Sequence, residues 1–138
     1  MIPPNNAELY RKALFEQTLI RRHFPFLETR ITGLALICRG SVKPTEQSGR
    51  YKIEIVHTGV AAPQVRILNP TIEFSSEIHM YRNGTLCLYD WREQPWQRNW
   101  RLHETVIPWT AEWLVFYELF LLTGRWLGKA AEHGEPKA

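Results

Sequence analysis

The chain has little cysteine, no long run of hydrophobic residues and no marked excess of either charge. Its 138 residues contain two cysteines, Cys38 and Cys87, and no CxxC pair, which argues against a disulfide-stabilised fold and against a metal site. The N-terminus lacks the apolar run of a secretory signal. The most apolar stretch, residues 113–122, is shorter than the ~18 residues of a membrane span and contains Glu118. We therefore expect a cytoplasmic protein with reduced thiols and no membrane association.

Composition favours one domain with a protein partner. With 44% hydrophobic residues, the chain can bury one sizeable core. The formal net charge is only +3 and lysine and arginine are not clustered beyond Arg21 and Arg22, so nucleic-acid binding is not expected. Six tryptophans are many for this length, and we expect most of them to pack internally and some to face a protein partner. The sequence holds no glycine-rich nucleotide-binding motif, so no cofactor is expected.

The hydrophobic pattern indicates an α+β fold in which helices at both ends flank a group of strands. The predicted helices are residues 7–23 and 111–123, and the predicted strands are residues 30–39, 51–56 and 64–68. Asn6 can cap the first helix and Pro25 ends it, while Thr110 and Gly124 suit the two ends of the second helix. Short connections between successive strands predict an antiparallel meander. Residues 1–127 are expected to form one domain, followed by a disordered tail at 128–138.

Cys87 lies in the most informative segment of the chain. It follows the dipeptide Asn-Gly at positions 83 and 84, the strongest short signal for a hairpin, because both residues tolerate positive φ. The turn places the thiol on one limb of a tight loop, eight residues after His79. Because a reactive thiol needs partial exposure, we expect Cys87 to be accessible and to act as a nucleophile. Cys38 lies in an apolar run and is expected to be buried and structural.

Residues 78–89 resemble the active-site segment of ubiquitin-conjugating (E2) enzymes. Alignment on Gly84, Cys87 and Leu88 places His79 on the family asparagine, although the preceding His-Pro of the family motif is replaced. The endings Leu-Cys-Leu-Tyr at 86–89 and Pro-Trp-Thr-Ala-Glu-Trp at 108–113 look more like the bacterial E2-like proteins of short type II CBASS antiphage operons. The segment Pro-Gln-Val-Arg at 63–66 is similar to one in the third strand of E2 enzymes.

The resemblance implies a fold and a chemistry. The fold would be that of ubiquitin-conjugating enzymes: an N-terminal helix, an antiparallel four-stranded meander, an active-site cysteine loop and a C-terminal helix. Cys87 would carry a protein C-terminus as a thioester and transfer it to an amine, with a cGAS-like nucleotidyltransferase as the partner and acyl donor. By its position His79 would stabilise the oxyanion formed during transfer, or act as a base.

Two alternatives stay open at this stage. The chain can be a catalytically inactive E2 variant that only docks a protein partner, which the missing His-Pro favours and the retained Cys87 disfavours. Asp90, His103 and Glu104 follow the cysteine within an irregular segment, and each either positions the attacking amine or is an ordinary loop residue. The sequence names neither the acceptor lysine nor the oligomeric state.

Overall fold

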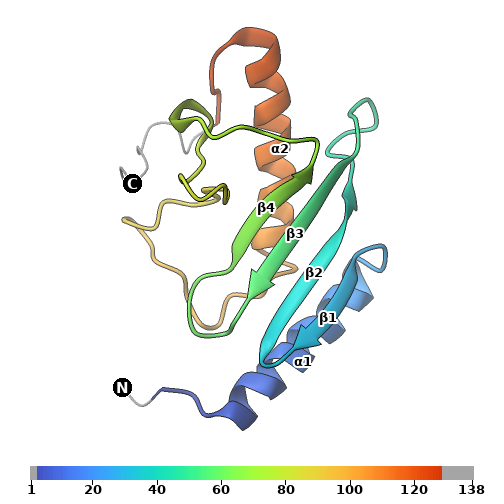
Figure 1. The fold of residues 1–138 in the computed structure, drawn as a ribbon, viewed down its shortest axis with the longest axis vertical. Coiled ribbons are helices and arrows are strands. Elements are labelled where there is room, and N and C mark those ends of the chain that lie inside the picture. Colours follow the sequence, from blue (N-terminus) through green and yellow to red (C-terminus); the bar gives the residue numbers. More distant parts are fainter. Residues whose placement is uncertain (1–2, 129–138) are drawn as a thin grey trace.

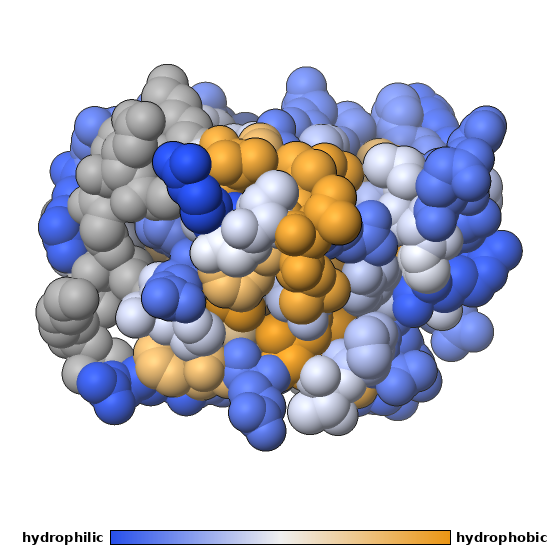
Figure 2. All heavy atoms as spheres, turned by 90° about the horizontal axis from the view of Figure 1, so that it is seen from above, coloured by the Kyte–Doolittle hydropathy of each residue, from blue (hydrophilic) through white to orange (hydrophobic). Residues whose placement is uncertain are grey.

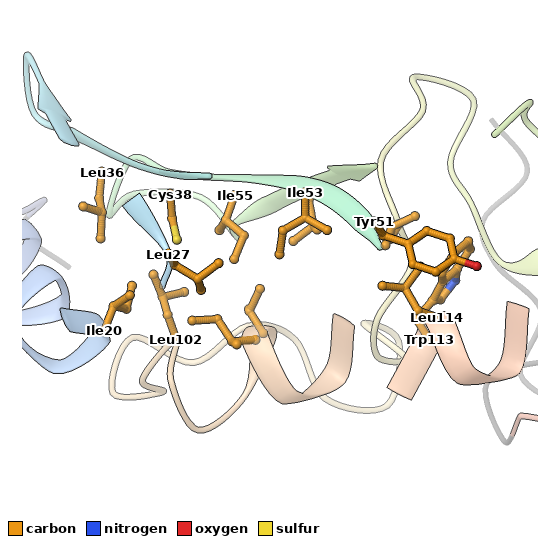
Figure 3. Packing of buried hydrophobic residues seen from close by; sticks show 14 of the residues in the cluster. Ile20, Leu27, Leu36, Cys38, Tyr51, Ile53, Ile55, Leu102, Trp113 and Leu114 are labelled. Atoms are coloured by element: carbon orange, nitrogen blue, oxygen red, sulfur yellow. The ribbon is translucent and has the colours of Figure 1, made fainter. Parts of the chain in front are cut away.

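A computed structural model describes residues 3–128 of the chain, and Figure 1 shows its arrangement. The elements are, in order, α1 (Asn6–His23), β1 (Glu28–Thr32), β2 (Ala35–Val42), β3 (Tyr51–His57), β4 (Gln64–Asn69), the 3-10 helix η1 (Ser76–Ile78) and α2 (Val106–Thr123). Each strand pairs antiparallel with the next in the order β1-β2-β3-β4. Both helices lie on one face of this sheet (Figures 1 and 3). The α+β arrangement with a helix at each end of a four-stranded meander is therefore confirmed.

Helix α1 forms as its sequence predicts, one residue earlier than expected. Asn5 rather than Asn6 is the cap, and its side-chain oxygen accepts a hydrogen bond of 2.9 Å from the backbone N–H of Glu8. The helix ends before Pro25, which cannot continue it. The predicted disordered tail lies outside the described residues except for Gly128, which is buried.

The first strands differ from the prediction. Residues 30–39 are not one strand but parts of two, because the chain turns at Gly33, whose φ of +61° belongs to the left-handed region. Ile31 and Leu36 are consequently paired across the β1–β2 hairpin instead of following each other along one strand. The missed signal was a break in alternation around a glycine, which is typical of a turn.

Helix α2 begins earlier than predicted, at Val106 rather than residue 111. Pro108 lies in its first turn, where a missing N–H costs nothing, so the proline does not delay the helix. Thr110 is not the cap; its hydroxyl is buried and donates a 2.7 Å hydrogen bond to the Val106 carbonyl. Gly124 ends the helix with a φ of +75°, as its position predicted.

By length and composition alone, α2 is apolar enough to span a membrane, although the sequence-based expectation considered only residues 113–122. Its first half packs against the sheet through Trp113 and Leu114, and the core helix of a globular domain has the same composition. Near its end Leu121 and Leu122 are 64% and 82% exposed. Figure 2 looks onto this end of the molecule and shows hydrophobic residues gathered in one patch.

The core fills the space between the sheet and the helices, as Figure 3 shows. The β3 side chains of Ile53 and Ile55 point toward the helix side of the sheet, and Ile20 of α1 approaches from the side. Cys38 lies among them with no exposed surface, and burial raises the pKa of its thiol to about 12. The prediction that Cys38 is buried is confirmed, and a thiol with that pKa holds its proton at neutral pH.

Candidate active site

A short hairpin brings the two predicted site residues together. The backbone N–H of Cys87 donates a 3.0 Å hydrogen bond to the carbonyl of His79, and the N–H of Tyr81 donates a 2.8 Å bond to the carbonyl of Thr85. Between these limbs the N–H of Gly84 donates to the Tyr81 carbonyl at 2.9 Å and closes the turn. The two residues of the predicted site, Cys87 and His79, are therefore neighbours at the level of the backbone.

The turn has one residue more than the two-residue loop that a pair of left-handed residues would make. Gly84 alone has a positive φ, of +88°, whereas Asn83 does not. A hydrogen-bonded turn followed by a left-handed glycine is the common three-residue hairpin loop. The Asn83 side-chain oxygen accepts hydrogen bonds from the Thr85 N–H at 3.0 Å and its hydroxyl at 2.6 Å. These bonds fix the limb that leads into Cys87.

His79 is held in an unusual backbone conformation. Its φ of 56° and ψ of 63° are left-handed, the one such non-glycine residue in the described part of the chain. The conformation costs about 1–3 kcal/mol and persists only where neighbouring contacts impose it. Here the Trp113 indole N–H donates a 3.1 Å hydrogen bond to the His79 carbonyl, and the imidazole ring lies 5.7 Å from the Trp126 ring. Helix α2 and the segment that follows it therefore set the position of His79.

Cys87 is not accessible as predicted, because only 5% of the residue is exposed. Its Sγ donates to the Tyr89 carbonyl at 3.6 Å. The thiol lines one side of an open cleft of about 280 Å³, whose opposite wall consists of aromatic residues of α2 together with Trp126. The expectation of exposure failed because these aromatic side chains come from far along the sequence. Cys87 nevertheless borders a cleft, whereas Cys38 does not border it.

Carboxylates line the same cleft. Asp90, Glu93 and Glu112 all border it, so a cationic amine is attracted toward the thiol. The Asp90 side chain also accepts a 3.0 Å hydrogen bond from the Arg92 N–H, which shapes the turn after the cysteine. Burial first, and then the nearby Cys87 charge, raise the pKa of the Tyr89 hydroxyl. The Tyr89 hydroxyl therefore keeps its proton at neutral pH.

The other two candidates of the irregular segment lie elsewhere. His103 and Glu104 are not among the residues that line the cleft in the described structure. The His103 ring stacks on the ring of His23 at 4.5 Å, and its Nε2 lies 3.9 Å from the Glu104 carboxylate. These contacts join the end of α1 to the turn before α2. For both residues the geometry favours an ordinary loop role.

Sequence reasoning missed Glu16, a carboxylate of α1 with no exposed surface. One of its oxygens accepts a 2.8 Å hydrogen bond from Arg101 Nη1, and the other accepts a 2.9 Å bond from the Leu102 backbone N–H. Glu16 thereby fastens the segment between the cysteine and α2 to the first helix. Its helical spacing with Ala13 and Ile20 was the available signal, since those residues form the buried face of α1.

The tryptophans mostly pack, which was the leading interpretation of the sequence. Trp96, Trp100 and Trp109 gather around Tyr89, with ring centroids 5.2 to 6.2 Å apart. This cluster closes the irregular segment over the chain that follows Cys87. Trp91 differs, because it is 43% exposed with the Arg92 guanidinium 5.8 Å from its ring. Few tryptophan side chains are therefore exposed for contact with a protein partner.

Comparison with known proteins places this geometry in a family. No curated protein matches the chain in sequence. The family described as Type II CBASS E2 protein matches residues 16–134, which include the hairpin with His79 and Cys87, the meander and all of α2. The match covers most of the chain, and the order of helix, meander, hairpin and helix is consistent with it. The chain belongs to the type II CBASS E2 proteins.

Proposed function

We propose that this CBASS E2 protein is an acyl transferase that carries a protein C-terminus as a thioester on Cys87 and passes it to an amine. We infer that the donor is the C-terminus of a cGAS-like nucleotidyltransferase in bacterial antiphage defence, and that the reaction takes place in the cytoplasm. The observation that carries the proposal is the hairpin in which the Cys87 N–H bonds to the His79 carbonyl beside an open cleft.

The first step loads the cysteine. The Cys87 thiolate attacks the carbonyl carbon of an activated C-terminus, the C–S bond forms, and the activating group leaves with its bonding electron pair. Because the sequence contains no glycine-rich nucleotide-binding motif, the acyl group arrives already activated, from a reaction elsewhere or by exchange with an existing bond. Both cysteines are free thiols in the structure, so the nucleophile is not blocked by a disulfide.

The second step transfers the acyl group to an amine. The neutral amine nitrogen attacks the thioester carbon and a tetrahedral oxyanion forms. It collapses as the C–S bond breaks, and the proton lost by the nitrogen passes to the departing Cys87 thiolate, which regenerates the thiol. His79 is 4% exposed and does not itself border the cleft, and the proposal is that an imidazole N–H of this residue donates a hydrogen bond to that oxyanion. Such a donor contributes about 10²-fold or more to the rate. The carboxylates of Asp90 and Glu112 border the cleft and attract the cationic amine, which gives up one proton to water before its neutral form attacks.

A docking module without catalysis is the second candidate, and one observation favours it. Only 5% of Cys87 is exposed, so a bulky acyl donor does not reach the thiol unless the neighbouring side chains move. The exposed aromatic residues Tyr10 and Phe15 on α1, at 46% and 50%, offer a surface for a partner in either case. Co-elution with the nucleotidyltransferase in size-exclusion chromatography therefore supports a partnership without deciding between the two functions.

The deciding experiment follows the fate of the thiol. Mixing the protein with an activated nucleotidyltransferase should give a covalent adduct that disappears with a thiol reductant. Cys87→Ser should convert it into an ester that resists reductant but is cleaved by hydroxylamine, and Cys87→Ala should abolish it. His79→Ala should still form the thioester but transfer it about 10²-fold more slowly.

Cys38→Ala is the matched control, because the second cysteine is buried away from the cleft. A folded Cys38→Ala protein should form the adduct as the unmodified protein does. If Cys87→Ala leaves both the adduct and downstream signalling intact, the catalytic role is wrong and the docking module is the better description.

A further inference from the structure

A second groove lies at the open end of the sheet, away from Cys87. It has a volume of about 890 Å³ and is bordered by the chain between α1 and β1, the last residues of β2, the start of β3 and the first turn of α2. The residues of α2 that border it, Ile107, Pro108 and Ala111, differ from those that border the Cys87 cleft. The two sites thus flank the same helix without sharing a wall residue.

The groove exists because β1 is shorter than β2. The first residue of β1, Glu28, pairs with Arg39, so residues 40–42 pair only with β3 and have no partner strand on their other side. Leu27 packs closely over Gly40, because a Cβ at this position would lie 2.6 Å from a Leu27 side-chain atom. The two residues after Gly40 are therefore the open part of this edge. An open strand edge accepts an extended segment by backbone hydrogen bonding.

The two sides of this edge have different chemistry. Alternate residues of β2 face the core, and at the groove Val42 is the half-buried residue on that side, next to Ile107 and Pro108 of α2. Phe26, which is 58% exposed, adds apolar surface. On the opposite face of the sheet the groove is bordered by Lys52 of β3, the pairing partner of Ser41 in the edge strand.

The charge of the groove is strongly positive. Its lining contains the cationic side chains Arg39, Lys43, Arg50 and Lys52 against the single carboxylate of Glu28. The formal charge of these lining residues is four minus one, or +3. The Arg39 guanidinium forms an ion pair with Glu54 at 2.6 Å. The side chains of the other three cationic residues make no hydrogen bond or ion pair with any described residue.

We propose that this groove binds an extended acidic segment of a protein partner, in which acidic and apolar side chains alternate. In an added strand successive side chains point to opposite faces, so one set meets Lys43, Arg50 and Lys52 while the other set meets Val42 and Phe26. The open backbone edge of β2 can form strand-type hydrogen bonds with a peptide but not with a nucleic acid, which favours a peptide as the occupant. The proposal is independent of the chemistry at Cys87.

The test uses the full chain, labelled with ¹⁵N, and a short synthetic peptide in which glutamate and leucine alternate. Saturable amide shifts are expected at Val42, Lys52 and Ala111, at peptide concentrations up to about 1 mM. A peptide with lysine in place of glutamate should give none of these shifts. Binding of the acidic peptide should weaken as salt is raised, because the cations are exposed.

The double variant Lys43→Glu/Arg50→Glu should lower the affinity for the acidic peptide by about tenfold or more, because like charges then face each other. Arg11→Glu/Arg30→Glu, which makes the same charge change at exposed positions outside the groove, should leave the affinity within about twofold. If the first variant does not fold, the salt dependence and the lysine peptide carry the test on the unmodified protein.

Three results would overturn the proposal. The first is no saturable shift in the groove with the acidic peptide, and the second is an equal response to the lysine peptide or equal weakening by both double variants. The third is tighter binding of a short oligothymidine at the same amides, which would make the groove a nucleic-acid site. Adduct formation at Cys87 is measured separately, so failure here is distinct from failure of the acyl-transfer proposal.

Discussion

Replacing Glu16 by alanine tests how the segment after Cys87 is held in place. The carboxylate has no exposed surface, and it receives hydrogen bonds from Arg101 at 2.8 Å and from the Leu102 N–H at 2.9 Å. Glu16→Ala removes both acceptors at once. It leaves a buried backbone N–H without a partner and a guanidinium, 30% exposed, that must find water.

The expected cost follows from these two losses. Removing one partner of a buried ion pair costs about 3–5 kcal/mol, and an unsatisfied buried N–H accounts for about 1–3 kcal/mol of that range. We therefore expect the free energy of unfolding to fall by about 3–5 kcal/mol for Glu16→Ala. Glu16→Gln keeps an acceptor for Leu102 and loses only the charge, so it should cost roughly 1.5–3 kcal/mol.

Urea denaturation followed by tryptophan fluorescence measures both values, because Trp96 and Trp100 belong to the fastened segment. Glu46→Ala removes an exposed carboxylate of the β2–β3 turn and should change stability by less than about 0.5 kcal/mol. A cost below about 1 kcal/mol for Glu16→Ala would refute the reasoning. Equal costs for alanine and glutamine would show that the charge matters and the hydrogen bond to Leu102 does not.

Two further predictions concern the cleft and the core. Trp126→Ala should speed iodoacetamide labelling of Cys87 by roughly tenfold, which corresponds to a free energy of cleft opening that is lower by about 1.4 kcal/mol. Leu127→Ala, at a half-exposed neighbour, should not change the rate. Equal labelling rates of the two variants in mass spectrometry would contradict this. Burial lowers the pKa of His57 from 6.5 to about 4, so the unfolded chain binds a proton in that window that the folded chain does not. The free energy of unfolding should therefore fall by up to about 3 kcal/mol as the pH drops from 6.5 to about 4. His57→Gln should remove most of this pH dependence in urea titrations. An unchanged slope of the unfolding free energy against pH would refute the prediction.

Local signals predicted most of the fold. The alternation in β3 and the Asn-cap of α1 are short-range patterns, and both elements were found within a residue of their predicted ends. The prediction failed where one residue supports two local structures. Gly33 was read as a strand glycine and is a turn, and Pro108 was read as preceding the helix and lies in its first turn.

The hairpin that carries the candidate site was predictable from local signals, but the enclosure of Cys87 was not. The Asn-Gly turn indicates that Cys87 and His79 lie on opposite limbs of one hairpin, since eight residues separate them across it. The burial of Cys87 depends on α2 and on Trp126, and no local pattern reports which distant aromatic residue covers a loop. Glu16 was missed for the same reason, because its partners are more than eighty residues away.

The enclosure of Cys87 bears on what the proposed chemistry requires. A thioester in open water is lost to hydrolysis, and a cleft walled by Trp109, Trp113 and Trp126 limits the access of water to it. The same walls also limit the access of the donor, so loading needs a displacement of side chains that transfer to a small amine does not. Trp126 is the aromatic wall residue that lies beyond the end of α2, and its ring lies 5.7 Å from the His79 ring. Its displacement would therefore open the thiol and change the surroundings of the imidazole together, which makes Trp126 the residue through which loading and transfer are coupled under the proposed mechanism.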